Sequence, residues 1–276
     1  MTVLPLARIC RTLSIGRATA YRTTGPRAPH YHRGEDRTVT AQIRAVIRTR
    51  ASYGYRRVTA LVNRAFGTGY NPKRIRRVMA LNGWTLPAMT HRRTGRPHTG
   101  RIRRDGSNER WCSDTLEVAC GNGEFVVVAF ALDCHDREAL AHVAAARDLV
   151  AQDIQQLMQA AVTARFGTGR PPVPIQWLSD NGGIYTALET LCAAERLHLV
   201  PITTPAYSPQ SNGMSEAFVN TLRRDYLAGA DLSSAAVVLD QVAGWLADYN
   251  ALAPHSALGM QSPVQYRQQK ELLPAP

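Results

Sequence analysis

Three carboxylates, Asp114, Asp180 and Glu216, have the types and spacing that metal-assisted chemistry needs. Asp114 lies within "RWCSDTLEVAC", which reads as a strand, and Asp180 ends the short apolar strand "IQWLSD". Glu216 follows Asp180 after a gap of 35 residues, in the first turn of a helix expected to begin at Gly213. Open α/β sheets place their chemistry at the ends of strands. If the three acids converge, their mutual repulsion predicts bound divalent cations.

Each acid also has a simpler interpretation. Asp114 fits an exposed charge, and Asp180 stands before Asn-Gly-Gly, an ordinary turn sequence. Glu216 fits an acid that complements the partial positive charge at a helix N-terminus. The three positions alone leave both interpretations open, so the elements that carry them matter.

From Trp111 onward the sequence predicts an α/β fold. "RWCSDTLEVAC" and "GEFVVVAFALDC" flank a Gly-Asn-Gly turn and predict a hairpin, and "ALAHVAAA" predicts a third strand. Strands are also expected at "IQWLSD" and "HLVPI", with helices at 148–165, 183–195, about 214–227 and 232–250. Three consecutive strands followed by alternating helices and strands indicate a mixed sheet flanked by helices.

The charge divides the chain into two parts. Residues 1–104 hold 23 Lys and Arg residues and only two acids, Glu35 and Asp36, which gives a net charge of +21. Residues 105–276 hold 10 Lys and Arg residues and 19 acids, which gives a net charge of −9. A basic first third predicts binding to a polyanion, with a solvated surface as the plain alternative. Helical apolar periodicity over much of this part argues against a disordered tail.

The basic part divides further into four segments. Residues 1–22 predict two short helices of a helix-turn-helix-like segment, and 23–36 read as a linker. Residues 37–84 predict a small all-α, basic DNA-binding domain. Its third helix, opened by Asn-Pro, carries cations around an apolar stripe and suits a DNA groove. Residues 85–107 read as a basic linker that follows phosphates, or as a plain solvated linker.

Composition excludes several other classes. No apolar run approaches the roughly 20 residues that a membrane span needs, and no signal peptide is apparent, so a cytoplasmic protein is expected. The five cysteines form no C-x-x-C pair, which favours reduced thiols over a zinc site or disulfides.

Four ordered motifs resemble a known family. "WCSDTLE", "LSDNGGIYTALE", "YSPQSNGMSEAFVNTLRRDYL" and "YNALAPHSALGMQSPVQY" resemble insertion-sequence transposases with a retroviral-integrase-type core, specifically the second-reading-frame product of the IS-three group. "YGYRRVTALVN" and "YNPKRIRRVMALNGW" are similar to the small helical domain that precedes that core. The resemblance covers nearly the whole chain.

The resemblance implies a ribonuclease-H-like catalytic core at 108–228 and a packed C-terminal helix and tail at 229–276. It implies that Asp114, Asp180 and Glu216 are catalytic and hold two divalent ions, Mg²⁺ or Mn²⁺ as a substitute. Such a pair of ions stabilises both oxygens of an in-line phosphoryl displacement, as DNA cleavage and strand transfer require. A homo-oligomer on DNA and a first-frame transposase partner, fused by frameshifting, are implied as well, in the bacterial cytoplasm with the nucleoid.

The helix from Gly213 should present Glu216, Asn220 and Arg223 on one face and pack its Phe218 face on the sheet. The full set of expected DNA contacts is Arg56, Arg57, Lys73, Arg74, Arg76, Arg77, Arg101, Arg103, Arg104, Asn181, Tyr207, Ser208, Gln210, Asn212, Asn220 and Arg223.

One departure from the group concerns its tail motif, where an arginine usually precedes the Pro-His pair and Ala253 stands here. Two other functions stay open from the sequence. One is a ribonuclease-H-like nuclease or resolvase that cleaves without joining, and the other is a catalytically inactive DNA-binding regulator.

Overall fold

The computed structural model describes residues 5–21, 31, 33–87, 105–203 and 213–272. The expected hairpin forms the centre of a five-stranded sheet, in the order β3-β2-β1-β4-β5. β1, β2 and β3 are antiparallel neighbours, whereas β4 runs parallel to β1 and β5 parallel to β4. The mixed sheet is therefore confirmed. The strands are β1 Arg110–Ala119, β2 Phe125–Asp133, β3 Ala139–Ala145, β4 Ile175–Ser179 and β5 Leu199–Thr203.

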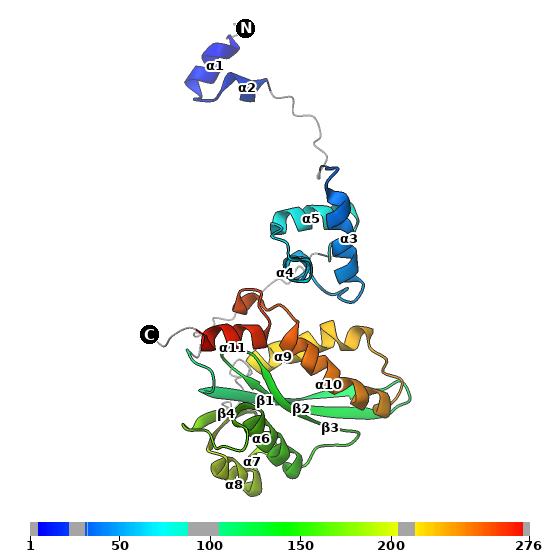
Figure 1. Ribbon diagram of the computed structural model, residues 1–276, viewed down its shortest axis with the longest axis vertical. Coiled ribbons are helices and arrows are strands. Elements are labelled where there is room, and N and C mark those ends of the chain that lie inside the picture. The colour runs from blue at the N-terminus through cyan, green and yellow to red at the C-terminus, as the bar shows by residue number, and fades with distance from the viewer. Residues whose placement is uncertain (1–4, 22–30, 32, 88–104, 204–212, 273–276) are drawn as a thin grey trace, which may run out of the picture.

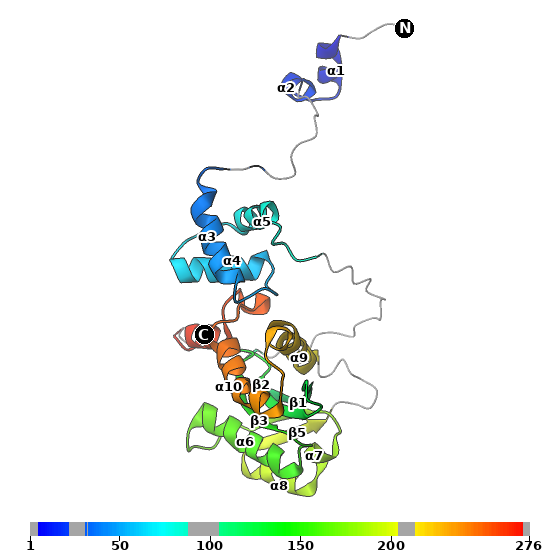
Figure 2. The same cartoon turned by 90° about the vertical axis from the view of Figure 1, so that its right-hand side faces the viewer.

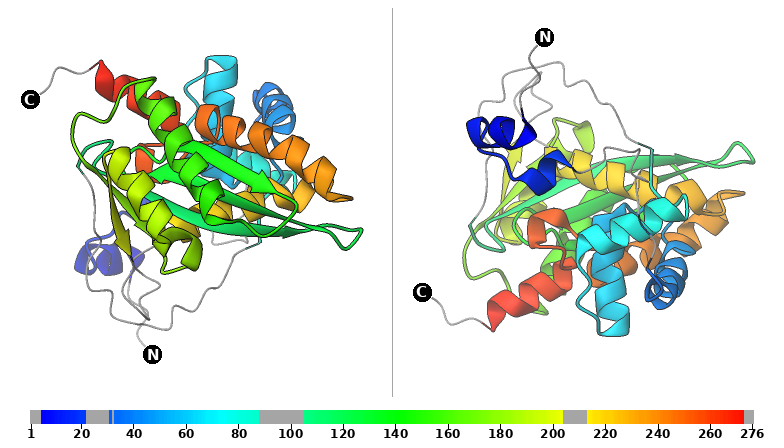
Figure 3. Two further views of the ribbon diagram at one scale, coloured as in Figure 1. Left: turned by 90° about the horizontal axis from the view of Figure 1, so that it is seen from below. Right: turned by 90° about the horizontal axis from the view of Figure 1, so that it is seen from above.

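Helices cover both faces of the sheet (Figures 1 and 3). α6, α7 and α8 lie on one face, and α9 and α10 lie on the other. In the chain, the short 3-10 turn η2 follows α9, and the 3-10 turn η3 and then α11 follow α10. The bounds are α6 Ala151–Phe166, α7 Gly183–Thr186, α8 Leu188–Arg196, α9 Gly213–Asp225, η2 Leu227–Gly229, α10 Ala235–Ala251, η3 Ser256–Leu258 and α11 Pro263–Glu271.

Alternation along the strands sorts the core into two clusters. On β1, Cys112 and Leu116 join the cluster under α9 and α10, whereas Trp111 joins the cluster under α6 and α8. Successive side chains of a strand point to opposite faces. Asp114 therefore lies on the same face as Cys112 and Leu116, the face that α9 covers.

Two helical predictions need correction. The helix expected over 183–195 is broken at Ala187, whose backbone is extended (ψ 137°), so α7 and α8 are separate. α11 was not expected as a helix of its own, although its start is marked in the sequence. Pro263 occupies the first turn, and Ser262 and Gln265 form a reciprocal capping box.

The basic part of the chain is helical, as expected, with α1 Leu6–Thr12, α2 Arg17–Ala20, α3 Asp36–Ile47, α4 Tyr55–Phe66 and α5 Pro72–Leu81. α3, α4 and α5 share an apolar core that includes Ile43, Val62 and Ile75. We call residues 36–81, these three helices with the loops between them, the helical unit. Figures 1 and 2 show it beside the side of the core that carries α9, α10 and α11. Among the described helices, none is both long and apolar enough to cross a membrane.

Candidate active site

The parallel pairing of β1 and β4 brings Asp114 and Asp180 to one place. Cys112 on β1 is in register with Leu178 on β4, and each acid lies two residues further along its strand direction. Paired residues of parallel strands face the same side, and neighbouring strands lie about 4.8 Å apart. The two carboxylates therefore come together on the face that α9 covers, at the carboxyl end of β4.

Burial and charge both act on Asp114. The residue is half-buried, and burial together with the negative charge of Asp180 raises the pKa of its carboxyl group above the ordinary value. The backbone N–H of Thr115, which donates to Asp114 Oδ1 at 2.8 Å, opposes that shift. Burial is the larger cause of the raised pKa, and the charge of Asp180 adds to it, so a cation between the two carboxylates would favour their charged forms.

A tight turn holds Asp180, which is exposed at the end of β4. The N–H of Gly182 donates to Asp180 Oδ1 at 3.0 Å. A Cβ atom added at Gly182 would lie 3.0 Å from the same oxygen, closer than real Cβ contacts normally come. Glycine at this position therefore lets the backbone approach the carboxylate.

The opposite face of β1 is anchored just behind this pair. Ser113 is buried, and its hydroxyl lies 3.0 Å from the hydroxyl of Tyr185 on α7. Burial raises the pKa of Tyr185, so the phenol stays neutral. This contact ties the turn after Asp180 to the residue before Asp114. The sequence prediction missed Tyr185, although its position five residues after Asp180 marks it as part of the same turn and helix.

α9 has the two faces that the sequence predicts. Glu216, Asn220 and Arg223 are exposed, whereas Phe218 and Leu222 are buried in the cluster against the sheet. The Phe218 ring packs on Phe130 with centroids 4.5 Å apart. Phe130 is the β2 residue paired with Asp114, so the first turns of α9 lie over the strand that carries this acid.

The structure does not close the three acids into one metal-binding group. Within the described residues, no three His, Cys, Asp or Glu side chains are placed so that they could hold a metal ion. Asp114 and Asp180 form the pair that the sheet positions, and Glu216 lies on a helix over the same face without completing a trio.

The C-terminal motif, by contrast, finds structural partners. The Asn250 amide exchanges two 2.8 Å hydrogen bonds with the backbone of Ala139 at the start of β3. The Tyr249 ring contacts Phe218 edge-on at 4.8 Å, and His255 contacts Tyr249 at 4.7 Å. Ala253 is 1% exposed and packs in the same cluster. The motif therefore holds α10 and the tail against the sheet and α9.

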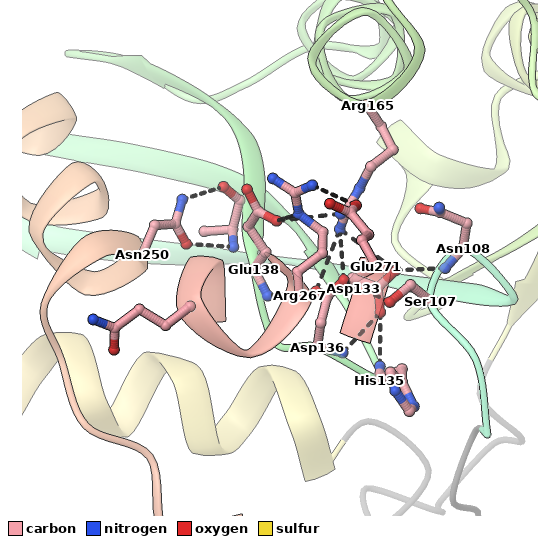
Figure 4. Close-up of polar contacts among 12 residues, drawn as sticks. Ser107, Asn108, Asp133, His135, Asp136, Glu138, Arg165, Asn250, Arg267 and Glu271 are labelled. Carbon is pink, nitrogen blue, oxygen red and sulfur yellow. Dashed lines mark hydrogen bonds and ion pairs between the residues drawn. The ribbon is translucent and has the colours of Figure 1, made fainter. Parts of the chain in front are cut away.

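A buried polar cluster, shown in Figure 4, lies on the α6 face of the sheet and was not predicted. Asp133, the last residue of β2, and Asp136, in the turn after it, are fully buried and pair with Arg165 of α6. Glu138 accepts from Arg267 of α11 at 2.7 Å and pairs with Arg165 at 3.2 Å. These ion pairs fasten α6 and α11 to the turn between β2 and β3, which is a structural role.

The expected DNA contacts on the helical unit separate into two groups. Arg56, Lys73 and Arg76 are exposed. The other three form ion pairs within the protein. Arg57 pairs with Asp225, and both Arg74 and Arg77 pair with Asp36. Arg77 is only 7% exposed, because it also donates to the Tyr31 carbonyl. We therefore leave these three arginines out of the proposed DNA surface.

Near the acids, Asn181, Asn220 and Arg223 are exposed. The other expected contacts lie outside the described residues, namely Arg101, Arg103, Arg104, Tyr207, Ser208, Gln210 and Asn212.

The fold and the site define an integrase-type catalytic core of the ribonuclease-H-like class, preceded by a helix-turn-helix-like domain. The chain matches the integrase core domain family over residues 104–209 and 199–263, and an HTH-like domain family over 34–93. A chain of the simian T-cell lymphotropic virus intasome, solved with the PP2A regulatory subunit B56 gamma, has a similar fold. The TM-score is 0.50 at 17% identity, over 86% of this chain and 77% of that chain.

Relatives in sequence are closer. Transposase InsD of insertion element IS2 from Escherichia coli is 41% identical over 243 residues, covering 86% of this chain and 80% of that protein. The same figures hold for the InsD copy of IS2D in strain K12. The chain belongs to the insertion-element transposases, in the group that includes IS2.

Proposed function

We propose that this transposase cleaves DNA strands at the ends of an insertion sequence and joins them to target DNA, with Asp114, Asp180 and Glu216 as the catalytic carboxylates. The observation that carries the proposal is the parallel register that aligns Asp114 with Asp180 under α9. A nuclease-type metal site is built from such parts: two acids in register on adjacent strands and a third acid on the helix that covers them.

The donor set fits divalent cations. Carboxylate oxygens are the ligands that Mg²⁺ prefers, and a cation would stabilise the charged forms of the neighbouring Asp114 and Asp180 carboxylates. Asp114 and Asp180 would hold the ions, Mg²⁺ or Mn²⁺, and Glu216 would join them by a movement of α9 toward the pair, because the described residues do not form a closed group of three acids. When bound, such ions neutralise charge on a phosphate under attack and on the leaving oxygen. The chain's own contribution is to fix Asp114 through β1 and Asp180 through the Gly182 turn.

DNA is the proposed partner of two surfaces. Arg56, Lys73 and Arg76 form the exposed basic surface of the helical unit, and Asn181, Asn220 and Arg223 surround the acids. Arg56 and Arg76 come from different helices, and both lie against Tyr55, at 5.4 and 5.7 Å from its ring centroid. Two cations therefore gather at one aromatic ring, where we propose that they bind one stretch of phosphates.

The remaining parts of the proposal concern assembly and domains. We propose a homo-oligomer on DNA, a first-frame partner protein and a location at the nucleoid, as the resemblance to the IS-three group implies. We also propose a helix-turn-helix-like segment at 1–22, linkers at 23–36 and 85–107, a DNA-binding domain at 37–84, a catalytic core at 108–228 and a packed tail at 229–276.

The decisive test is strand transfer from a labelled DNA carrying the element's ends. Wild-type protein with Mg²⁺ should cleave and join, and Asp180→Asn should lose both steps by at least 1,000-fold, about 4 kcal/mol in the barrier. Glu189→Gln, which removes an exposed carboxylate in the first turn of α8, should keep both steps.

The outcomes separate the three functions. Cleavage without joining would indicate a nuclease or resolvase. DNA binding with neither step, in Mg²⁺ and in Mn²⁺, would indicate an inactive regulator. Either result would overturn the proposal.

A further inference from the structure

The helical unit is fastened to the catalytic core by polar contacts, most of them partly buried. Asp225, the last residue of α9, accepts a hydrogen bond from Ser52 Oγ at 2.6 Å and one from Arg57 Nη1 at 2.8 Å. Arg50 donates to Asp248 of α10. Arg64 donates to the backbone carbonyls of Leu252 and Met260 in the tail, at 3.1 and 3.4 Å.

These contacts follow from the sequence of α4. Arg57 and Arg64 are seven residues apart, two helical turns, so they lie on one face of α4. That face is turned to the core, whereas Arg56 next to it is exposed. Tyr53, 1% exposed, packs against Arg57, whose guanidinium carbon lies 3.4 Å from the ring centroid. The aromatic ring therefore holds the guanidinium in the orientation that reaches Asp225.

Asp225 is the centre of the contact. Its side chain is 1% exposed, and besides Ser52 and Arg57 it accepts two 2.8 Å hydrogen bonds from its neighbour Arg224. A charged carboxylate at this depth needs such donors, because burial without them is costly. Losing Arg57 would therefore remove the only ion pair by which the described part of the helical unit holds α9.

α9 is held near its middle and at its C-terminal end. Near the middle, Phe218 lies between Phe130 on the sheet and Tyr249 on α10, with ring centroids 4.5 and 4.8 Å apart. At the C-terminal end, Asp225 is bound to the helical unit. Glu216 and Asp225 are nine residues apart in one helix, about 13.5 Å along its axis. A rigid helix of that length transmits a shift at Asp225 to the first turn.

We propose that Asp225 is a positioning residue for DNA strand transfer: the helical unit, acting through Arg57 and Ser52, fixes α9, the helix that carries Glu216, against the face of the sheet that carries Asp114 and Asp180. The inference rests on the proposed function and deepens it. The HTH-like domain is then a part of the catalytic unit in addition to being a DNA-binding arm.

The first experiment compares two arginines that share one carboxylate. Arg57→Gln breaks the contact between the helical unit and α9, whereas Arg224→Gln removes the same charge from Asp225 within α9, where Arg224 is 54% exposed. At saturating DNA, Arg57→Gln should reduce the joining rate at least tenfold and raise the Mg²⁺ concentration for half-maximal rate at least threefold. Arg224→Gln should stay within twofold of wild type in both quantities.

The second experiment does not depend on activity. In the full chain without DNA, amide hydrogen exchange over 213–218 should accelerate at least tenfold in Arg57→Gln and remain unchanged in Arg224→Gln. Ser52→Ala, which removes one hydrogen bond and keeps the ion pair, should change exchange in the same direction by a smaller factor. It provides the comparison if Arg57→Gln does not fold.

The outcomes distinguish the inference from the proposed function. A wild type that never joins DNA refutes the proposed function, and the exchange measurement still tests the position of α9. Unchanged exchange over 213–218 in both Arg57→Gln and Ser52→Ala would overturn the inference. So would a joining defect in Arg57→Gln that disappears at saturating DNA with an unchanged Mg²⁺ requirement, because Arg57 would then act in DNA binding.

Discussion

Phe218 of α9 packs on Phe130 of β2 with ring centroids 4.5 Å apart, and Phe130 pairs across the sheet with Asp114. This contact joins the helix that carries Glu216 to the strand pair that carries Asp114. Both rings are buried, at 2% and 0% exposure, so the contact also contributes to the stability of the core.

Phe218→Ala should lower the free energy of unfolding by about 3 to 5 kcal/mol, the usual cost of replacing a buried phenylalanine by alanine. Urea unfolding followed by circular dichroism measures this cost. Leu239→Ala on α10 is the control, because Leu239 is 36% exposed, and it should cost under about 1 kcal/mol. Equal losses in the two variants would show that Phe218 is not a packing centre.

The turn after Asp180 gives a second prediction. Gly182→Ala should reduce joining at least tenfold, because the new Cβ would lie 3.0 Å from Asp180 Oδ1 and displace that carboxylate. Gly183→Ala is the matched control, since a Cβ at Gly183 meets nothing within 4 Å. Strand-transfer rates of the two variants, measured side by side, provide the check. If Gly182→Ala joins as fast as Gly183→Ala, the close approach at Gly182 has no role in the reaction.

The tail predicts a pH dependence. Burial, together with the positive charges of Arg57 and Arg137, lowers the pKa of His255 from 6.5 to about 4. Between these values the unfolded chain binds a proton that the folded protein does not, so stability falls as the pH drops from about 6.5 to about 4. At about 1.36 kcal/mol for each unit of pKa, the loss reaches about 3 kcal/mol.

His255→Gln should remove that part of the acid sensitivity. Urea unfolding of both proteins at intervals from pH 7 to pH 4 measures it as the difference between two stability curves. The difference in the free energy of unfolding between the two proteins should be smaller at pH 4 than at pH 7. Parallel curves would mean that His255 titrates alike in the folded and unfolded chains.

The parts of the site that local spacing controls were predictable. The strand period of 2 places Asp114 within one strand and Asp180 after another, and the helix period of 3.6 gives the two faces of α9. Both periods depend only on residues that are near neighbours in the sequence. The break at Ala187 was not predictable, because no glycine or proline marks it. The roles of the arginines were not predictable either. Arg57 and Arg76 look alike in sequence, but the first binds Asp225, 168 residues away, and the second is exposed.

The exposed cations of the helical unit predict a salt dependence. Lys73→Glu combined with Arg76→Glu should weaken DNA binding and flatten the dependence of log K on log salt by about 1.8, since each phosphate contact contributes about −0.9 to the slope. Titrations of labelled DNA at several salt concentrations measure the slope. Arg170→Glu with Arg196→Glu, exposed cations on the α6 and α8 side, should leave it unchanged. An unchanged slope in the first double variant would show that α5 faces away from DNA.

The exposed face of α9 gives the last prediction. Glu216, Asn220 and Arg223 follow one another along this face, with Arg223 about 10.5 Å beyond Glu216 at about 1.5 Å per residue. A strand whose phosphate is held near Glu216 would pass the guanidinium, which can donate to a neighbouring phosphate. No ion pair within 4.0 Å to a described carboxylate involves Arg223. Its charge is therefore not used to stabilise the described part of the fold.

Arg223→Glu should reduce joining at least tenfold, because the reversed charge repels the strand that Arg223 would hold. The melting temperature should stay within about 2 °C of wild type, as expected for an exposed side chain that forms no ion pair with a described carboxylate. Arg196→Glu, an exposed arginine in the last turn of α8, provides the control with the same change of charge and should join normally. If Arg223→Glu also joins normally, Arg223 does not serve the reaction, and the DNA strand does not follow this face of α9 as far as its last turn.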